Sequence, residues 1–162
     1  MSHKDLLESF ASGANRLEEA LRALPKEMWD FKPAPDRWSV REIIVHIPDS
    51  EASGYVRCRK IIAQSGVTVD AYDQDAWAEL LGYRHRSVEN ALDLFRCLRQ
   101  STVELLESVD DATWENHIHH PEDGMMTLSK WLYLYDHHIT KHISQMRRNF
   151  EAWEEAGRPK AG

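Results

Sequence analysis

The stretch TLSKWLYLYDHHITKHISQMRRNFEAWEEA, residues 127–156, has the clearest helical period in this chain. With about 100° of rotation per residue, its large apolar side chains fall within roughly 40° of one direction. These side chains are Leu128, Leu132, Tyr135, Ile139, Ile143, Met146 and Phe150. Gly157 and Pro159 follow directly and favour a helix end there. We therefore predict a long helix from about Thr127 to Ala156 that buries one face.

Three further stretches repeat apolar residues at the same helical spacing. They cover about residues 5–24, 39–66 and 87–109. Ser39, with Glu42 three residues later, is a capping-box signature for the second stretch. Pro48 lies inside that stretch and lacks a backbone donor, so we expect a kink or an irregular turn there. The four stretches predict an all-α fold, an antiparallel four-helix bundle.

Two long connections complete this single predicted domain, residues 1–162. Residues 67–86 join the second and third helices, and a short helix is expected at about 73–81, with Trp77, Leu80 and Leu81 packed beneath it. A polar, His-rich loop over residues 110–126 precedes the fourth helix. No convincing strand alternation is visible in the chain. Connections of this length can form the walls of a binding site at one end of a bundle.

Composition excludes several classes of partner. The chain has 162 residues, 42% of them hydrophobic, and a formal net charge of -7 at pH 7. A surplus of acidic groups disfavours nonspecific binding to nucleic acid and to anionic membranes. The sequence begins without a signal-peptide pattern and has no apolar run of membrane-spanning length. The two cysteines show no disulfide or metal-knuckle pattern, so we expect a cytoplasmic protein.

Histidines are the candidate metal-binding residues. The helical period places two of them that are adjacent in sequence on opposite faces of the predicted helix. His142 falls about 40° and His138 about 80° from the centre of the apolar face, on the same side. His137 falls on the opposite face, toward water. An inward pair at positions i and i+4 can hold one ion. His46, at the edge of the apolar stripe of the second helix, can supply a third imidazole.

The alternative is that these histidines are ordinary core residues held by hydrogen bonds. Three neutral imidazoles at the edge of a core would then leave several ring nitrogens in need of partners. We therefore predict that His46, His138 and His142 bind one divalent metal ion, while a purely structural role stays open.

Four segments resemble the DinB-like superfamily of metal-dependent four-helix proteins, which includes the YfiT-like branch. They are KPAPDRWSVREIIVHIPDSE (32–51), DQDAWAELLGY (73–83), ATWENHIHHPEDGMMTLSKWL (112–132) and DHHITKHISQMRR (136–148). The last looks like the H-x-x-x-H-x-x-Q ending of the family. The resemblance spans most of the chain, about residues 31–148, and departs from the family at Pro48.

The resemblance implies an antiparallel bundle, frequent dimerisation, and a nickel or zinc ion held by His46, His138 and His142. Some branches are transferases or isomerases that use a low-molecular-weight thiol. Three His ligands leave an open coordination position, as in catalytic sites. We therefore expect a metal-dependent transferase or hydrolase that activates a thiol or water for attack on a small electrophile. A non-catalytic protein stabilised by its ion, or a plain interaction module, remains the alternative.

Three further residues are candidates for acid–base work near the ion. Asp49, one turn beyond His46, can orient a ligand or accept a proton, although it can equally face solvent. His119 and His120, in the loop before the fourth helix, can overhang the site as an acid or base. The alternative for both is an exposed loop without chemistry.

Overall fold

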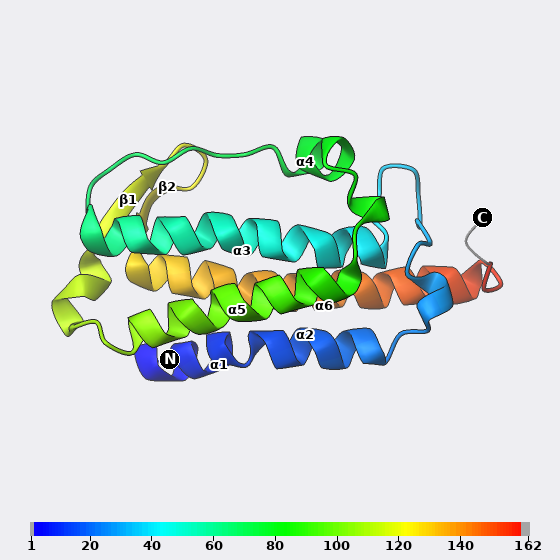
Figure 1. Ribbon diagram of the computed structural model, residues 1–162, viewed down its shortest axis with the longest axis horizontal. Coiled ribbons are helices and arrows are strands. Elements are labelled where there is room, and N and C mark those ends of the chain that lie inside the picture. Colours follow the sequence, from blue (N-terminus) through cyan, green and yellow to red (C-terminus); the bar gives the residue numbers. More distant parts are fainter. Residues whose placement is uncertain (1, 160–162) are drawn as a thin grey trace.

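The computed structural model describes residues 2–159, and these form a four-helix bundle (Figure 1). The long helices are α3 (Val40–Ala63), α5 (Val88–Leu106) and α6 (Leu128–Glu155). The fourth position is shared by α1 (His3–Ala11) and α2 (Gly13–Arg22). No helix in the described part of the chain is long and apolar enough to cross a membrane. The predicted all-α bundle is confirmed.

The first predicted helix is interrupted, because α1 and α2 meet at Ser12. Ser12 donates its hydroxyl to the carbonyl of Ser9, which competes with the regular helical pattern. Gly13 begins α2, and a Cβ there would lie 2.6 Å from Nη1 of Arg99. The break therefore occurs where a buried guanidinium approaches the backbone closely.

The helix α3 continues through Pro48, where we expected a kink or irregular turn. Ser39 caps it with the predicted capping box, in which Ser39 Oγ accepts from Glu42 N and Glu42 accepts from Ser39 N. Pro48 is itself buried, as are residues 42–47 before it and Ser50 and Glu51 after it. Tertiary packing therefore holds the helix together across the missing backbone donor.

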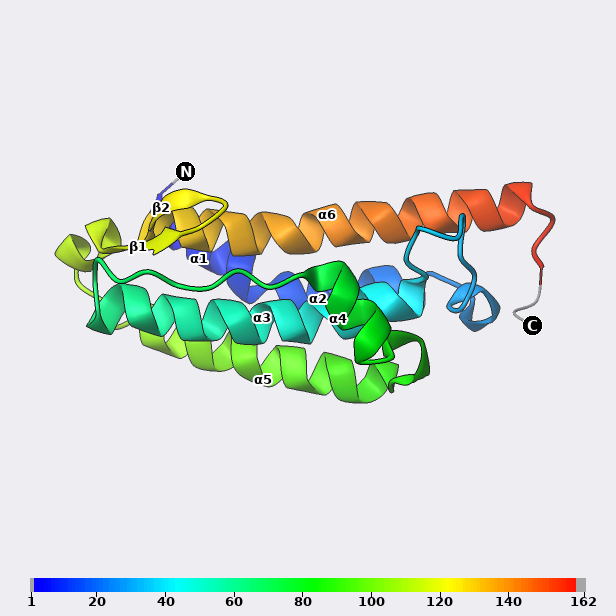
Figure 2. The same cartoon turned by 90° about the horizontal axis from the view of Figure 1, so that it is seen from above.

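The connection between α3 and α5 lies along the seam between α3 and α6 (Figure 2). It contains α4 (Gln74–Leu80) and a 3-10 turn at Tyr83–His85. Trp77 is half-buried and its ring packs on Tyr72, but Leu80 is 82% exposed and Leu81 is exposed. The prediction that both leucines pack beneath α4 is wrong, because the short helix turns that side to solvent.

The predicted His-rich loop contains a β-hairpin, so the expectation of no strands is wrong. A 3-10 turn at Asp111–Glu115 leads into β1 (His117–His120), which pairs antiparallel with β2 (Gly124–Thr127). The connection after α3 adds to this hairpin, since Val69 N donates to the carbonyl of His119 and His119 N donates to that of Val67. The hairpin thereby fixes the connection above the seam.

Candidate metal centre

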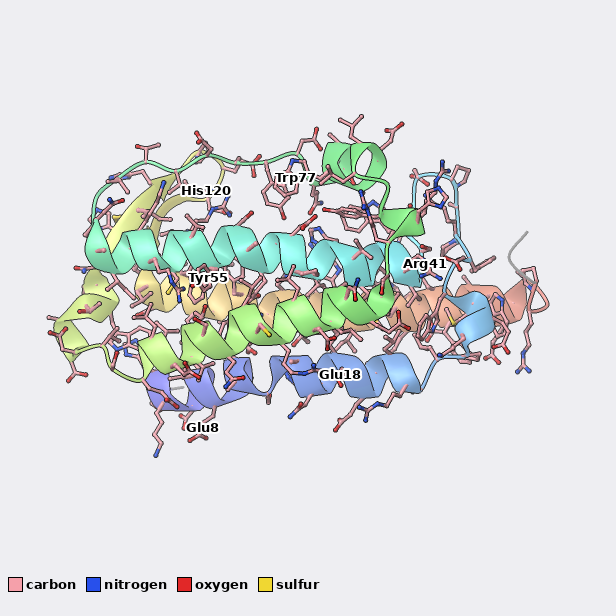
Figure 3. The ribbon with its side chains drawn as sticks, viewed as in Figure 1. Glu8, Glu18, Arg41, Tyr55, Trp77 and His120 are labelled. Carbon is pink, nitrogen blue, oxygen red and sulfur yellow. The ribbon has the colours of Figure 1, made fainter. Side chains whose placement is uncertain are left out.

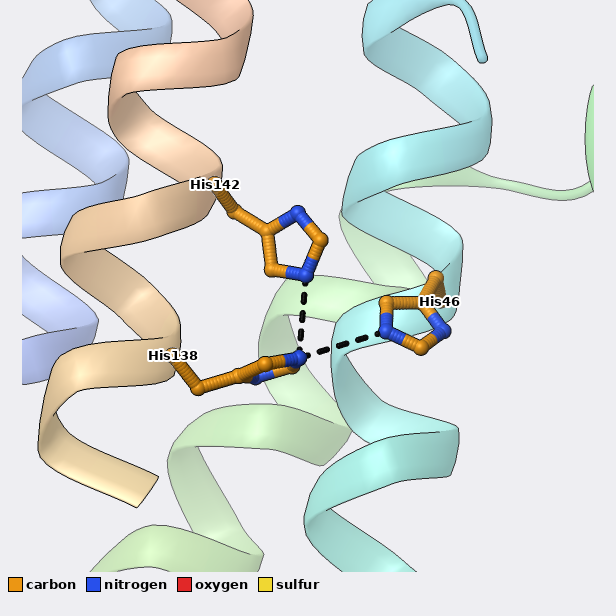
Figure 4. Close-up of side chains that lie close together, drawn as sticks. All are labelled: His46, His138 and His142. Carbon is orange, nitrogen blue, oxygen red and sulfur yellow. Dashed lines mark hydrogen bonds between the residues drawn. The ribbon is translucent and has the colours of Figure 1, made fainter. Parts of the chain in front are cut away.

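His46, His138 and His142 face one another between α3 and α6 (Figure 4). Nε2 of His138 lies 3.3 Å from Nε2 of His46 and 2.9 Å from Nε2 of His142. One ligand atom from each residue lies within 4.8 Å of the other two. His137, the neighbour in sequence, is exposed and stacks on Tyr133. The structure therefore brings together the three histidines that the sequence predicts and leaves out His137.

Desolvation keeps all three imidazoles neutral, with His46 and His142 buried and His138 half-buried. Burial, together with the nearby His142 and Lys141, lowers the pKa of His46 to about 3. Burial lowers the pKa of His142 to about 4, and that of His138 lies well below its ordinary value. A neutral imidazole has one bare ring nitrogen, which is the form that binds a metal.

The spacing of the ring nitrogens fits a metal ion. Imidazole nitrogens bind zinc at about 2.0–2.1 Å in tetrahedral geometry, which places two ligand nitrogens roughly 3.3 Å apart. The two Nε2 separations of 3.3 and 2.9 Å lie close to that value. An uncharged, all-imidazole donor set suits zinc, nickel, copper and iron, whereas calcium and magnesium need oxygen ligands.

Among the described residues, one of the three Nδ1 atoms, that of His142, has a hydrogen-bond partner. Nδ1 of His142 lies 3.0 Å from Oε1 of Gln145, to which it can donate, so that Nε2 keeps its lone pair. Nδ1 of His46 and Nδ1 of His138 are buried and have no partner among the described residues. Trp38 packs on the His46 ring at a centroid distance of 4.8 Å. These contacts hold the rings in place from outside the centre.

Asp49 lies on the same helix as His46 but bonds elsewhere. The hydroxyl of Tyr83 donates to Oδ2 of Asp49 at 2.5 Å. Burial and this hydrogen bond raise the pKa of Tyr83, so the phenol keeps its proton. The hydrogen bonds of the described residues include none between Asp49 and a histidine of the centre.

The two hairpin histidines lie outside the cluster. His119 is exposed and its backbone binds the connection after α3. His120 is buried, and its Nδ1 accepts from the backbone N–H groups of Glu122 and Asp123 at 3.3 and 3.2 Å. The ring is therefore neutral, so the Asp123 carboxylate 3.2 Å from the same nitrogen does not form an ion pair with it.

The model of the DinB superfamily matches residues 9–146 of this sequence. The chain belongs to the DinB superfamily. Proteins named "Putative metal-dependent hydrolase" are similar to this superfamily member over most of their length. One from Oceanobacillus iheyensis is 28% identical over 130 residues, 80% of this chain and 75% of that protein. One from Bacillus mycoides is 29% identical over 136 residues, 82% of this chain and 78% of that protein.

Two solved structures share the fold of this DinB-superfamily chain. YfiT from Bacillus subtilis, described as "a probable metal-dependent hydrolase with an unusual four-helix bundle topology", superposes with a TM-score of 0.85 at 22% identity. The match covers 97% of this chain and 90% of YfiT. The mycothiol-dependent maleylpyruvate isomerase superposes with a TM-score of 0.72 at 9% identity, over 90% of this chain and 61% of that one. At these identities the likeness concerns the fold.

Sequence reasoning gave no role to two residues of this superfamily member that lie beside the centre. Gln145 is the final residue of the H-x-x-x-H-x-x-Q pattern, so a signal for it was present. Tyr135 packs on the His138 ring at a centroid distance of 6.4 Å, and its position on the apolar face predicted only a core side chain. Its hydroxyl accepts from Nη1 of Arg57 at 3.3 Å, a contact between helices that no local pattern reveals.

Proposed function

We propose that this protein is a metal-dependent hydrolase acting on a small electrophilic substrate. One observation carries the proposal: three neutral imidazoles from two helices direct their Nε2 atoms at a common point. The names of its relatives, metal-dependent hydrolases at 28–29% identity, support the same reading.

His46, His138 and His142 would hold the ion, nickel or zinc, and leave a coordination position open. When bound, such an ion supplies Lewis acidity, which lowers the pKa of a water or thiol so that it becomes a nucleophile at neutral pH. Gln145 positions the His142 ring by accepting from Nδ1. An acid–base role remains a prediction for Asp49, His119 and His120. Of these three residues, only His120 is buried.

Thiol transfer is a second candidate. The fold is shared with a mycothiol-dependent isomerase, and an ion that activates water also activates a thiol. We also propose that the protein is a homodimer, which light scattering would test, and that it is cytoplasmic, which cell fractionation would test. A non-catalytic role, with the ion only joining α3 to α6, is the outcome to exclude.

Metal content tests the proposed site directly. Protein purified without a His tag should contain about one nickel or zinc per chain by elemental analysis, and His138→Ala should abolish uptake. His137→Ala is the matched control, because the neighbouring side chain is exposed and should leave uptake unchanged. Wild-type protein that takes up neither metal would overturn the proposal.

Activity separates the three roles. Ester and amide hydrolysis, and transfer of a low-molecular-weight thiol to small electrophiles, would be measured with the metal-loaded and the metal-free protein. Metal-dependent hydrolysis supports the first candidate and metal-dependent thiol transfer the second. Absence of both, with metal bound, favours a stabilising ion.

A further inference from the structure

A cavity of about 530 Å³ lies under the connection that covers the seam between α3 and α6. Its walls include Ser50 and Arg57 from α3, Tyr72 from the connection and His120 from the hairpin. Figure 3 shows His120 on the hairpin, on the side of α3 that the connection covers. This volume is within the range of small-molecule sites.

Arg57 brings to this cavity a positive charge that forms no ion pair with the described residues. Its Nη2 donates to the carbonyl of Asp70 at 2.7 Å and its Nη1 to the hydroxyl of Tyr135 at 3.3 Å. Within residues 2–159, no carboxylate lies within 4.0 Å of the guanidinium. Both partners are uncharged and fix the position of the guanidinium without neutralising it.

Tyr135 adds a hydrogen-bond donor beside that charge. The phenol is buried and accepts from Arg57, and none of the hydrogen bonds in the described part of the chain uses its O–H as a donor. The charge of Arg57 and the free donor of Tyr135 therefore lie on atoms 3.3 Å apart. A planar carboxylate accepts from such a pair of donors.

Ser50 in the cavity wall and Tyr135, the hydrogen-bond partner of Arg57, both lie close to the proposed metal centre. Ser50 lies one helical turn after His46 on α3, and Tyr135 lies one turn before His138 on α6. The ring centroids of Tyr135 and His138 are 6.4 Å apart. A group held by Arg57 would therefore place the rest of a small substrate toward the three histidines.

Acidic residues are also present, but they lie at the rim. Asp73, Glu122 and Asp123 are exposed, so water and salt screen their charges. The carboxylate of Asp73 already accepts from the backbone of Asp75 and Ala76. His120 is neutral and adds no charge. The rim thus disfavours a multiply charged anion more than a single carboxylate.

We propose that Arg57 and Tyr135 bind a carboxylate of the substrate and so select small carboxylic-acid derivatives. That the bound acid is a substrate rests on the proposed hydrolase function. The binding of the acid itself can be tested without metal or turnover.

The test is an NMR titration of metal-free, nitrogen-15-labelled protein with benzoate and butyrate. Each acid is paired with its uncharged amide, benzamide or butyramide, which has nearly the same shape. We expect the acids to shift amide signals around Ser50, Arg57 and Tyr72, and the amides to shift none. Because the protein is metal-free, the ion cannot be what holds the acid.

Variants assign the binding to the two side chains. Arg57→Gln should weaken benzoate binding by at least about tenfold, and Tyr135→Phe by about three- to tenfold. Arg57→Lys should retain part of the affinity because it keeps the charge. Thermal melting would show that each variant is folded.

Arg59→Gln is the matched control from the same helix. The Arg59 guanidinium lies over the Tyr55 ring and donates to Ser101, and Figure 3 shows Tyr55 on the opposite side of α3 from His120. Benzoate binding should be unchanged in this variant. Equal binding of acid and amide, no binding of either acid, or equal loss in Arg59→Gln and Arg57→Gln would each overturn the inference.

The two proposals can fail separately. Protein that binds nickel or zinc through His138 but does not bind benzoate would retain the metal-dependent function and lose the carboxylate site. Protein that binds benzoate through Arg57 but takes up no metal would retain the site and lose the hydrolase function.

Discussion

At the residue scale, three neutral imidazoles bring their Nε2 atoms together between α3 and α6. Nε2 of His138 lies 3.3 Å from Nε2 of His46 and 2.9 Å from Nε2 of His142, and as a neutral ring nitrogen it carries either one N–H or one lone pair for these two contacts. Burial disfavours protonation, which would otherwise supply a donor. A divalent ion bound at this point would accept a lone pair from each ring, and the hydrogen bond of His142 Nδ1 to Gln145 would help to hold it.

Gln145→Ala should weaken metal binding by about 10- to 100-fold, because outer partners of ligating histidines contribute on that scale. The variant removes the acceptor of Nδ1 of His142 and frees the ring to rotate. Competition with a chromophoric chelator would measure the affinity. Ser144→Ala is the control, since Ser144 bonds only within its own helix. Equal affinities for Gln145→Ala and wild-type protein would contradict this role.

The residue scale also separates what the sequence could predict from what it could not. Helical period alone distinguishes His138 and His142 from His137, because direction around a helix is a local property. His46 came mainly from the resemblance to the DinB-like superfamily. Arg57 and Tyr135 could not be paired, since their contact depends on how α3 packs against α6.

At the element scale, one buried ion pair joins all four helical positions. Arg99 of α5 donates to both carboxylate oxygens of Glu51 in α3, at 2.8 and 2.6 Å. It also donates to the carbonyls of Phe10 in α1 and Tyr135 in α6. Its guanidinium lies over the rings of Phe10 and Phe95. The pair thereby fixes the relative positions of the helices.

Glu51→Gln should lower the free energy of unfolding by about 3–5 kcal/mol, because it leaves a buried guanidinium uncompensated. Urea denaturation would measure the loss. Replacing both partners together, Glu51→Leu with Arg99→Met, should recover much of it, since no buried charge remains. The pair of the exposed Arg96 with the half-buried Glu18 is the comparison, and Arg96→Gln should leave the urea midpoint almost unchanged. Equal losses in the two single variants would show that burial is not the cause.

Gly54 allows α3 and α6 to approach closely. A Cβ at this position would lie 2.3 Å from Cε1 of Tyr135, whose ring is buried and stacked on Trp131. Gly54→Ala should therefore lower the free energy of unfolding by about 1–2 kcal/mol, despite the better helix propensity of alanine. In a Tyr135→Ala background the same change should be neutral or stabilising, by up to about 1 kcal/mol. A loss of equal size in both backgrounds would exclude the ring contact as its cause.

The elements that the sequence did not predict are those whose stability comes from distant partners. Each strand of the hairpin has only four residues, too few for a visible alternation. The hairpin is completed by residues 67–69, about fifty positions away in the sequence. Likewise, the break at Ser12 depends on Arg99, which a local pattern cannot place.

At the scale of the whole molecule, the bundle separates stability from chemistry. The ion pair of Arg99 with Glu51 lies in the middle of the bundle, whereas the histidines and the cavity lie along the covered seam of α3 and α6. The long connection and the hairpin form a cover over that seam and bond to one another. The buried ion pair therefore joins the helices in the core, and the candidate centre lies apart from it beneath the cover.

Metal should stabilise the whole fold, because the ion binds residues of α3 and α6 that converge only in the folded chain. An ion present at a thousand times its dissociation constant adds about 4 kcal/mol. For a chain of this size the melting temperature should then rise by roughly 8–16 °C over that of chelator-treated protein. Differential scanning calorimetry would measure the rise, with magnesium as the ion control and His138→Ala as the variant control. A similar rise in His138→Ala would place the ion elsewhere on the molecule.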